Sequence, residues 1–260
     1  MSTNNPSGAN ISPPDSGETA DFGFRAVPRA EKSTLVREVF DSVAGKYDTM
    51  NDLMSLGIHR LWKRELLTLM NPRPYYKLLD LAAGTGDISF GWLKKGGGPA
   101  VMSDINESML TVGRERAAAN GCLGDLEFLL ADAENLPLPD ASFDRISMAF
   151  GLRNCTNKEK VIAQAYRLLR PGGRFLVLEF SKLQIAGLES LYDLWSFKAL
   201  PKIGKIVAKD AESYQYLAES IRMFPPQEQL KQMFETAGFE RVSYRNLSGG
   251  IAAIHSGWRL

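Results

Sequence analysis

A tight glycine turn follows a short apolar run at residues 77–81. The segment Leu81-Ala-Ala-Gly-Thr-Gly-Asp87 contains Gly84, Thr85 and Gly86 and leads into residues of helical character. Glycine tolerates positive φ and lets a ligand approach the backbone, while the start of a helix offers unpaired N–H groups. At the carboxyl end of a parallel strand, this arrangement is typical of a site for a polar or negatively charged ligand. The turn alone is also compatible with a purely structural role.

A second candidate ligand-binding residue lies about 20 residues beyond the turn. The apolar run Ala100-Val-Met-Ser-Asp104 ends in an acid, at the spacing from which a carboxylate holds ribose hydroxyls. Together, the glycine turn and Asp104 favour an adenosyl ligand. A dinucleotide-binding loop would have a third glycine near position 89, where Ser89 stands. A nicotinamide-dependent dehydrogenase is therefore the weaker interpretation.

The segment Leu130-Ala-Asp-Ala-Glu134 follows the third apolar run and supplies the next candidates. We expect Asp132 to accept a hydrogen bond from an adenine amino group, and Ala133 to belong to the same cofactor-binding segment. The alternative for Asp132 is a solvated acid in a turn.

Alternating apolar runs and helices must position these residues. The expected strands cover residues 77–81, 100–103, 126–130, 143–149 and 174–180, and the expected helices cover 88–94, 107–119 and 158–169. This alternation predicts an α/β fold in which a mostly parallel sheet carries helices on both faces and binds ligands at its carboxyl edge. A last helix, at 226–237, precedes strand-like runs at 241–247 and 250–256, which predict a terminal hairpin.

Further segments flank this core. Residues 1–23 are rich in Ser, Asn, Pro and Gly and carry no Lys or Arg, which predicts a disordered tail. Helical spacing at 31–47 and 50–70, interrupted near Gly57, predicts a helical cap within residues 24–74. The aromatic-rich stretch 183–223 interrupts the alternation and is interpreted as a helical lid insertion. Residues 24–260 are thus expected to form a single domain.

Composition argues against several classes of protein. The 260 residues include 31 basic and 30 acidic side chains, a net charge of +1, so no overall field favours nucleic acid. Cys122 and Cys155 are too few for a disulfide framework or a cysteine-built zinc site, and His59 and His255 lack metal-binding spacing. No apolar run reaches the roughly 18 residues of a transmembrane helix. We expect a cytoplasmic enzyme without a metal.

Longer strings in the chain resemble a known family. The glycine turn, Asp104, residues 130–134 and Leu169-Arg-Pro-Gly-Gly173 together resemble the class I S-adenosylmethionine-dependent methyltransferases. More specific strings resemble the ubiquinone/menaquinone biosynthesis C-methyltransferases: Val39-Phe-Asp-Ser-Val-Ala-Gly-Lys-Tyr-Asp48, Asp104-Ile-Asn-Glu-Ser-Met-Leu110 and Phe150-Gly-Leu-Arg-Asn154. This resemblance extends over nearly everything after the tail.

The resemblance implies a fold and a reaction. The fold is a Rossmann-like, seven-stranded, mostly parallel sheet with an antiparallel C-terminal hairpin. The cofactor is S-adenosyl-L-methionine, and the substrate is a polyprenylated quinol methylated on a ring carbon. That quinol is 2-methoxy-6-polyprenyl-1,4-benzoquinol on the ubiquinone route and demethylmenaquinol on the menaquinone route. The chain departs from many members at Ala149, where serine is common, and from some at Asp132, where they have Asn.

Ring methylation needs a quinol carbon activated by a deprotonated oxygen and aligned with the methyl group. Arg153 and Asn154 follow the fourth strand, where the methyl group is expected. We predict that Arg153 stabilises an oxyanion as a fixed cation and that Asn154 orients the quinol oxygen. The alternatives are a surface or lid ion pair for Arg153 and a helix cap for Asn154. Tyr47 is the third candidate, for binding the quinol hydroxyl or relaying its proton, with helix termination as its alternative.

The two histidines are weaker candidates. His59 is the only plausible imidazole base in the resembling strings, with a structural role as the favoured alternative. We expect His255, in the last strand, to pack or form a hydrogen bond at the sheet edge.

Several partners are expected beyond the quinol. Lysines in and beside the insertion predict transient contact with the inner face of a membrane, with a solvated lysine face as the alternative; these are Lys182, Lys198, Lys202, Lys205 and Lys209. Other quinone-biosynthesis enzymes and a second copy of the chain are further expected partners. Two other functions stay open: methylation of another small phenol or lipid, and a non-catalytic S-adenosylmethionine-binding subunit.

Overall fold

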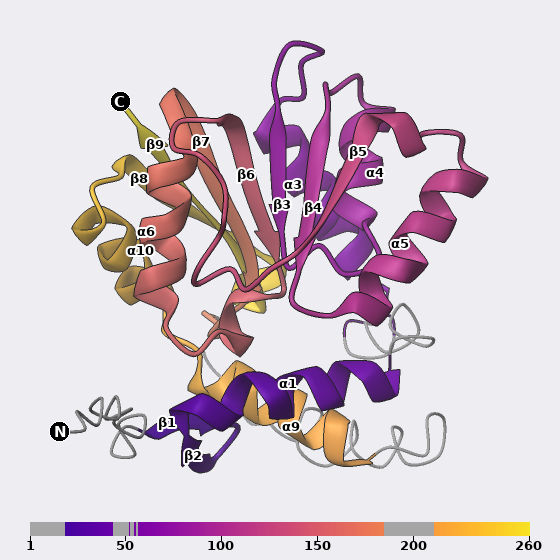
Figure 1. Cartoon of the computed structure of the whole chain (residues 1–260). Coiled ribbons are helices and arrows are strands. Elements are labelled where there is room, and N and C mark those ends of the chain that lie inside the picture. The colour runs from indigo at the N-terminus through magenta and orange to yellow at the C-terminus, as the bar shows by residue number, and fades with distance from the viewer. Residues whose placement is uncertain (1–18, 44–51, 53–54, 56, 185–210) are drawn as a thin grey trace, which may run out of the picture.

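The computed structural model describes residues 19–43, 52, 55, 57–184 and 211–260. Its main sheet has the strand order β5-β4-β3-β6-β7-β9-β8 (Figure 1). The strands are β3 (Leu78–Leu81), β4 (Ala100–Asp104), β5 (Leu126–Leu130), β6 (Phe143–Ala149), β7 (Leu169–Phe180), β8 (Glu240–Leu247) and β9 (Ala252–Arg259). Pairing is parallel from β5 to β7, and β9 runs antiparallel to both β7 and β8. The predicted seven-stranded sheet with an antiparallel C-terminal hairpin is confirmed.

Helices cover both faces of this sheet. On one face lie α3 (His59–Met70), α4 (Asp87–Lys94) and α5 (Glu107–Ala119), which contribute Leu66 and Trp92 to one hydrophobic core. On the other lie α6 (Lys158–Leu168) and α10 (Gln227–Thr236), which build a second core around Phe234. Successive residues of a strand point to opposite faces. Leu78 and Leu79 of β3 accordingly belong to different cores, and both are fully buried.

The chain reverses its direction across the sheet beside β3. The strands β4 and β5 extend the sheet on one side of β3, whereas β6 and β7 extend it on the other. A parallel sheet binds ligands at the carboxyl ends of its strands next to such a reversal. The loops after β3 and β6 meet there so closely that a Cβ on Gly151 would lie 2.5 Å from the Cβ of Ala82. Glycine is therefore required at position 151.

A cap crosses the carboxyl ends of the strands. Figure 1 shows α1 (Arg29–Val43), α9 (Ala211–Met223) and the hairpin of β1 (Thr19–Phe22) and β2 (Arg25–Pro28) below the sheet. The ring of Phe22 stacks on that of Tyr216 at 4.2 Å, and the Phe24 amide donates to the Glu219 carboxylate at 3.0 Å. The N-terminal hairpin and α9 thus form one layer, although about 190 residues separate them in the sequence.

That hairpin corrects one sequence prediction. Residues 19–23 were expected in a disordered tail, but Thr19–Phe22 forms a strand and Phe22 is buried. The apolar signal is too short to be recognised alone, because a single buried ring anchors it against a helix far along the chain. Residues 1–18 of the tail and residues 185–210 of the insertion lie outside the described residues. The helix α9 is the described helical part of that insertion.

Two element boundaries also differ from expectation. The strand β7 begins at Leu169, where α6 ends, and not at residue 174 as expected, so Pro171, Gly172 and Gly173 lie within the strand. The register between β6 and β7 shifts at this point, and Gly172 has a φ of +81°. Proline and glycine therefore mark an irregular strand start here. A 3₁₀ turn at Ser248–Gly250, in place of a two-residue turn, joins β8 to β9.

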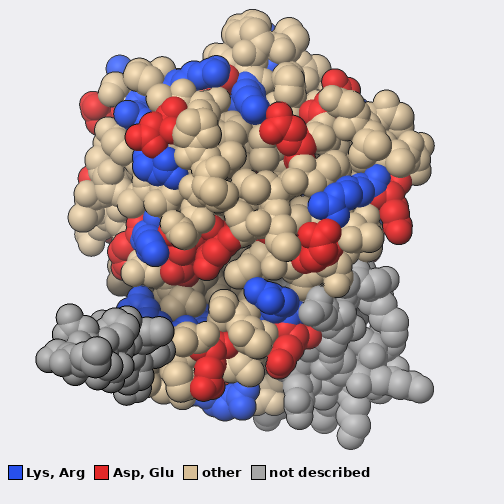
Figure 2. All heavy atoms as spheres, in the orientation of Figure 1, with Lys and Arg blue, Asp and Glu red and all other residues tan. Residues whose placement is uncertain are grey.

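Charged side chains are mixed over the surface. Figure 2 shows Lys and Arg interspersed with Asp and Glu over the face seen in Figure 1, in keeping with the net charge of +1. Among the described residues, no helix combines the length and apolar character that crossing a bilayer requires.

Candidate functional site

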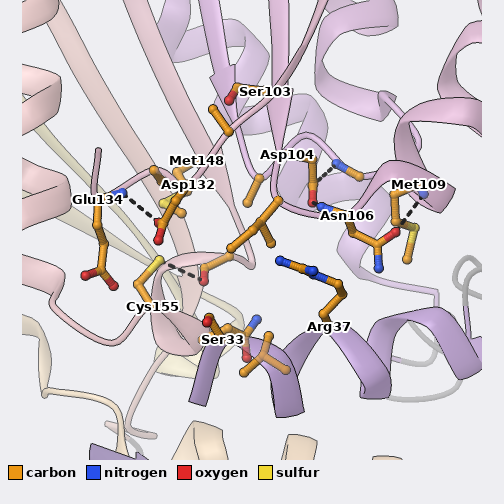
Figure 3. A pocket seen from close by; sticks show the side chains of 18 of the residues that line it. Ser33, Arg37, Ser103, Asp104, Asn106, Met109, Asp132, Glu134, Met148 and Cys155 are labelled. Carbon is orange, nitrogen blue, oxygen red and sulfur yellow. Dashed lines mark hydrogen bonds between the residues drawn. The ribbon is translucent and has the colours of Figure 1, made fainter. Parts of the chain in front are cut away.

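A pocket lies at the carboxyl ends of the central strands, beside α1 (Figure 3). Its empty volume, including the open mouth, is about 840 Å³. The lining comes from α1, from the loops after β3 and β5, from the end of β4 with the start of α5, and from the end of β6 with its loop. Segments from residue 33 to residue 156 converge on it.

The glycine turn forms one wall of this pocket. Gly84 lines it with a φ of +55°, a conformation that glycine adopts without strain. Gly86 precedes α4 with a φ of +96°, and a Cβ there would lie 2.7 Å from the side chains of Met102 and Phe90. Thr85 is buried behind the turn, where its Oγ1 accepts from the Arg116 guanidinium at 2.7 Å. Gly84 thus reaches the pocket, whereas Thr85 and Gly86 fix the shape of the turn.

Asp104 connects the glycine turn to the next strand. Its Oδ2 accepts from the Gly84 amide at 2.8 Å, and its Oδ1 accepts from the Asn106 amide at 2.9 Å. Burial raises the pKa of this carboxyl, and the backbone hydrogen bonds oppose that rise. Asp104 also lines the pocket. Each carboxylate oxygen has a second lone pair, so the side chain is able to hold a hydroxyl as well as the turn.

The segment after β5 lies on the adjoining wall. Asp132 and Ala133 both line the pocket, and Asp132 Oδ1 accepts from the Glu134 amide at 2.9 Å. Glu134 Oε1 accepts from the amides of Thr156 and Asn157 at 2.7 and 2.8 Å. This carboxylate therefore ties the loop after β5 to the loop after β6. Sequence reasoning assigned no role to Glu134.

Arg153 does not lie where its predicted role requires. It follows β6 in a 3₁₀ turn (Leu152–Asn154), but it is only 5% exposed and is not among the lining residues. Its Nη1 donates to Glu179 Oε1 at 2.7 Å, in an ion pair whose side chains are 2% and 1% exposed. The ion pair is buried and joins Arg153 to β7, so it also differs from the alternative of a surface or lid ion pair. A buried guanidinium requires such a compensating charge. Glu179 lies in β7, and no local pattern identified it.

Asn154 lies in the pocket wall. Its Oδ1 accepts from the Tyr216 hydroxyl of α9 at 3.1 Å. Burial raises the pKa of Tyr216, so the phenol stays protonated and remains a donor. The amide oxygen is thereby engaged, which directs the Nδ2 donors elsewhere. The alternative of a helix cap is wrong, since Asn157 caps α6 by accepting from the Lys160 amide at 2.8 Å. Tyr47, the third catalytic candidate, lies outside the described residues.

Both histidines have structural environments. His59 is buried and hydrogen-bonded through Nδ1 to Ser55 Oγ at 2.9 Å, and burial lowers its pKa. It does not line the pocket. His255 Nε2 contacts the Gln227 carbonyl at 2.9 Å, and burial lowers its pKa to about 4. The structural alternative for His59 is confirmed. His255 forms a hydrogen bond as expected, but β9 lies between β7 and β8 and is not the expected edge strand.

The inward face of α1 is the part of the pocket that sequence reasoning missed. Ser33, Val36 and Arg37 line it, at the i, i+3, i+4 spacing of one helix face. In Figure 3 the Arg37 guanidinium points into the pocket. Next to them, Lys32 is buried and its Nζ donates to the Cys155 carbonyl at 3.2 Å, while burial lowers its pKa to about 8. Lys32 thus docks α1 against the loop after β6.

A smaller pocket lies on the other side of the glycine turn, lined by Lys63, Asp80, Thr85 and Asp87 among others. Burial raises the pKa of Asp80 to about 6, although the hydroxyls of Ser147 and Ser89 donate to it. Ser89, in the place of a third glycine, therefore serves as a donor. Burial opposes ionisation of Asp87, but Lys63 and Arg116, at 2.7 and 2.8 Å, hold its pKa at about 2.

The side chains and backbone that line the main pocket suit the charge and the polar groups of S-adenosylmethionine. Its lining includes the acids Asp104, Asp132 and Glu134 and, as its cationic side chain, Arg37. An excess of carboxylates favours a ligand with a positively charged sulfur. The close approach of the backbone at Gly84 and the carboxylate at the end of β4 fit an adenosine with its ribose.

Comparison with known sequences gives consistent results. The model of the ubiE/COQ5 methyltransferase family matches residues 28–259. A protein of Acidiphilium cryptum named ubiquinone/menaquinone biosynthesis C-methyltransferase UbiE is 67% identical over 245 residues, which cover 94% of this chain and 98% of the relative. A protein of the same name from Brucella anthropi is 54% identical over 248 residues, covering 94% of each chain.

Solved structures share the fold at low sequence identity. A possible histamine N-methyltransferase from Thermotoga maritima has a TM-score of 0.61 at 21% identity, over 86% of this chain and 99% of that one. The [4+2]-cyclase SpnF has a TM-score of 0.66 at 16% identity, over 87% and 96%. These likenesses show a class I methyltransferase fold. Because one of them is named as a cyclase, the fold alone does not identify the reaction.

Proposed function

Since this chain belongs to the ubiE/COQ5 methyltransferase family, we propose that it methylates a ring carbon of a polyprenylated quinol in ubiquinone or menaquinone biosynthesis. It is an S-adenosylmethionine-dependent C-methyltransferase. The observation that carries the proposal is the 67% identity to a C-methyltransferase of these pathways over nearly the full length of both chains. The pocket supports it, because the glycine turn with Asp104 and the wall that carries Asn154 adjoin there.

We assign the cofactor to the side of the pocket formed by the loops after β3, β4 and β5. Gly84 gives the backbone its close approach, with Thr85 and Gly86 fixing the turn. Asp104 holds the ribose hydroxyls, and Asp132 with Ala133 contacts the adenine. When bound, S-adenosylmethionine supplies an activated methyl group on a positively charged sulfur. The carboxylates of the lining favour this cation over a neutral competitor.

We assign the acceptor to the side formed by the loop after β6. Asn154 donates from Nδ2 to the quinol oxygen, whose negative charge makes the ring carbon nucleophilic. The Tyr216 hydroxyl holds the Asn154 amide in that orientation. The charge of Arg153 is compensated by Glu179. We therefore assign Arg153 to stabilising the wall behind the acceptor, where it holds the Phe150 carbonyl. Tyr47 remains our candidate for binding the quinol hydroxyl.

The decisive experiment uses purified full-length chain, S-adenosylmethionine labelled on its methyl group and a short-chain demethylmenaquinol. We expect the label in the methylated quinol, at a ring carbon. Turnover of another phenol or lipid with no label in the quinol fraction would refute the proposal. Complementation of ubiquinone-deficient and menaquinone-deficient strains then separates the two pathways.

Contact with a membrane surface, with pathway enzymes or with a second copy is part of the same proposal. Support comes from large apolar side chains that are exposed in the cap and in α3, namely Phe24, Leu61 and Met223. Such residues suit an enzyme whose substrate carries an isoprenoid tail. Flotation with anionic liposomes should recover the chain in the lipid fraction, and its absence there would end the membrane proposal.

A further inference from the structure

Phe150 has an unusual backbone conformation in the wall of the acceptor side. It follows β6 directly, lines the pocket and has a φ of +60°. A bulky residue with positive φ is strained, and such strain persists only where the surrounding structure imposes it. Ala82 of the loop after β3, which lies against the next residue, Gly151, also lines the pocket and has a φ of +48°. Strained residues of this kind cluster at functional sites.

Hydrogen bonds on both sides of Phe150 impose its conformation. Its amide donates to the Leu178 carbonyl of β7 at 2.8 Å. Its carbonyl accepts from Arg153 Nη1 at 2.6 Å. Arg153 is therefore not only paired with Glu179, because the same guanidinium nitrogen holds the strained residue three positions earlier.

Glu179 in turn fixes Arg153 at two points. Its Oε1 accepts from Arg153 Nη1 at 2.7 Å, and its Oε2 accepts from the Arg153 amide at 3.2 Å. Oε1 also accepts from the Phe180 amide at 2.9 Å. The carboxylate is 1% exposed. Glu179 of β7 therefore holds the Arg153 side chain, and the Arg153 side chain holds the carbonyl of Phe150.

The ring of Phe150 lies against an aromatic cluster. Its centroid is 4.9 Å from that of Phe180 and 6.3 Å from that of Trp62. Trp62 is itself fixed, since its Nε1 donates to Ser248 Oγ at 2.9 Å. Trp62 and Phe180 thus pack against the Phe150 side chain, which is 2% exposed.

We propose that Phe150 positions the aromatic ring of the methyl acceptor, and that the Arg153–Glu179 pair is the device that holds Phe150 in place. The inference rests on the proposed function, which supplies a planar ring with a hydroxyl as the ligand. Aromatic rings pair by stacked or edge-to-face contact. Asn154, four residues further on in the same wall, contacts the oxygen of the ring that Phe150 orients.

The first test compares Phe150→Leu with Phe180→Leu. Both substitutions remove one ring from the same cluster, but Phe150 lines the pocket and Phe180 does not. For Phe150→Leu we expect kcat/KM for a short-chain quinol to fall about 3- to 10-fold, with the Kd for S-adenosylmethionine within about twofold of the parent. Phe180→Leu should change kcat/KM less. Equal losses in both variants, or a matching loss of cofactor affinity in Phe150→Leu, would overturn the inference.

The second test asks whether the ion pair is more than structural. Glu179→Gln leaves a buried cation without its partner, whereas the double variant Arg153→Met with Glu179→Met removes both charges. We expect the double variant to regain thermal stability relative to Glu179→Gln but to keep a low kcat/KM for the quinol. A double variant with parental kcat/KM would contradict the positioning role. If the parent enzyme itself leaves the quinol unlabelled, the proposed function fails; a parent that labels it alongside a normal Phe150→Leu defeats this inference alone.

Discussion

The two sides of the pocket are built by different means. On the cofactor side, Gly84 and Gly86 adopt positive φ without strain, and the buried carboxylate of Asp104 accepts from backbone amides of the turn and of Asn106. On the acceptor side, Phe150 adopts a left-handed backbone conformation although it is not glycine. The buried Arg153–Glu179 pair holds it in that conformation. The first arrangement is local and can be read from a few consecutive residues. The second depends on contacts across two strands, so it is more sensitive to a single change.

The largest expected effect comes from breaking the acceptor side at Glu179→Gln. Removing one member of a buried pair leaves an uncompensated charge, which costs about 3 to 5 kcal/mol of the free energy of unfolding. Urea unfolding measures it. The matched control is Asp140→Asn, whose pair with Arg167 is at the surface with Asp140 71% exposed. There we expect a change of under about 1 kcal/mol, and equal losses in both variants would show that burial does not matter.

We expect a somewhat smaller effect from Asp80, behind the glycine turn, on the pH dependence of the free energy of unfolding. Its pKa is raised by burial to about 6, so the folded state binds a proton more tightly than the unfolded state. The stabilisation is fully present below about pH 4 and is lost as the pH rises through about 6, with a total of about 3 kcal/mol. Asp80→Asn should remove this dependence in unfolding experiments between pH 4 and 7. If the variant keeps the parental dependence of stability on pH, another group is responsible for it.

Asp104→Asn should weaken the cofactor side alone. The variant loses charge-assisted hydrogen bonds to the Gly84 and Asn106 amides as well as the proposed ribose contact, so we expect the Kd for S-adenosylmethionine to rise about 10- to 100-fold. Calorimetry measures the Kd, and the KM for the quinol at saturating cofactor should stay within a few-fold. A larger effect on the quinol than on the cofactor would reverse our assignment of the two sides.

The smallest expected effect is that of Tyr216→Phe, which tests the acceptor side of the pocket alone. It removes one hydroxyl and leaves the ring stacked on Phe22, so only the orientation of the Asn154 amide is lost. We expect kcat to fall about 3- to 10-fold, the value of roughly one hydrogen bond. The Kd for the cofactor should be unchanged. Asn154→Ala combined with Tyr216→Phe should be no worse than Asn154→Ala alone, and additive losses would argue that the two residues act separately.

The fold was predictable to a large extent because its signals are periodic and local. The bounds of β5, β6 and α5 agree with the patterns of residues 126–130, 143–149 and 107–119. The N-terminal hairpin escaped prediction, because its stability comes from the stacking of Phe22 on Tyr216 of a distant helix. The strand β7 starts early because Leu169 already pairs with Phe143 of β6, while Pro171 and Gly172 lie in the register shift that follows.

The positions of the cofactor turn and of its acid follow from local sequence. Glycines, the end of a strand and an acid at fixed spacing shape only the backbone next to them, and long family-specific strings indicate the reaction. The role of Arg153, in contrast, follows from tertiary packing. Its positive charge is compensated 26 residues later by Glu179, and whether a charge faces substrate or a buried partner depends on which strands lie side by side. The role of α1 also follows from tertiary packing, because its inward face lines the pocket through the packing of the cap across the strand ends.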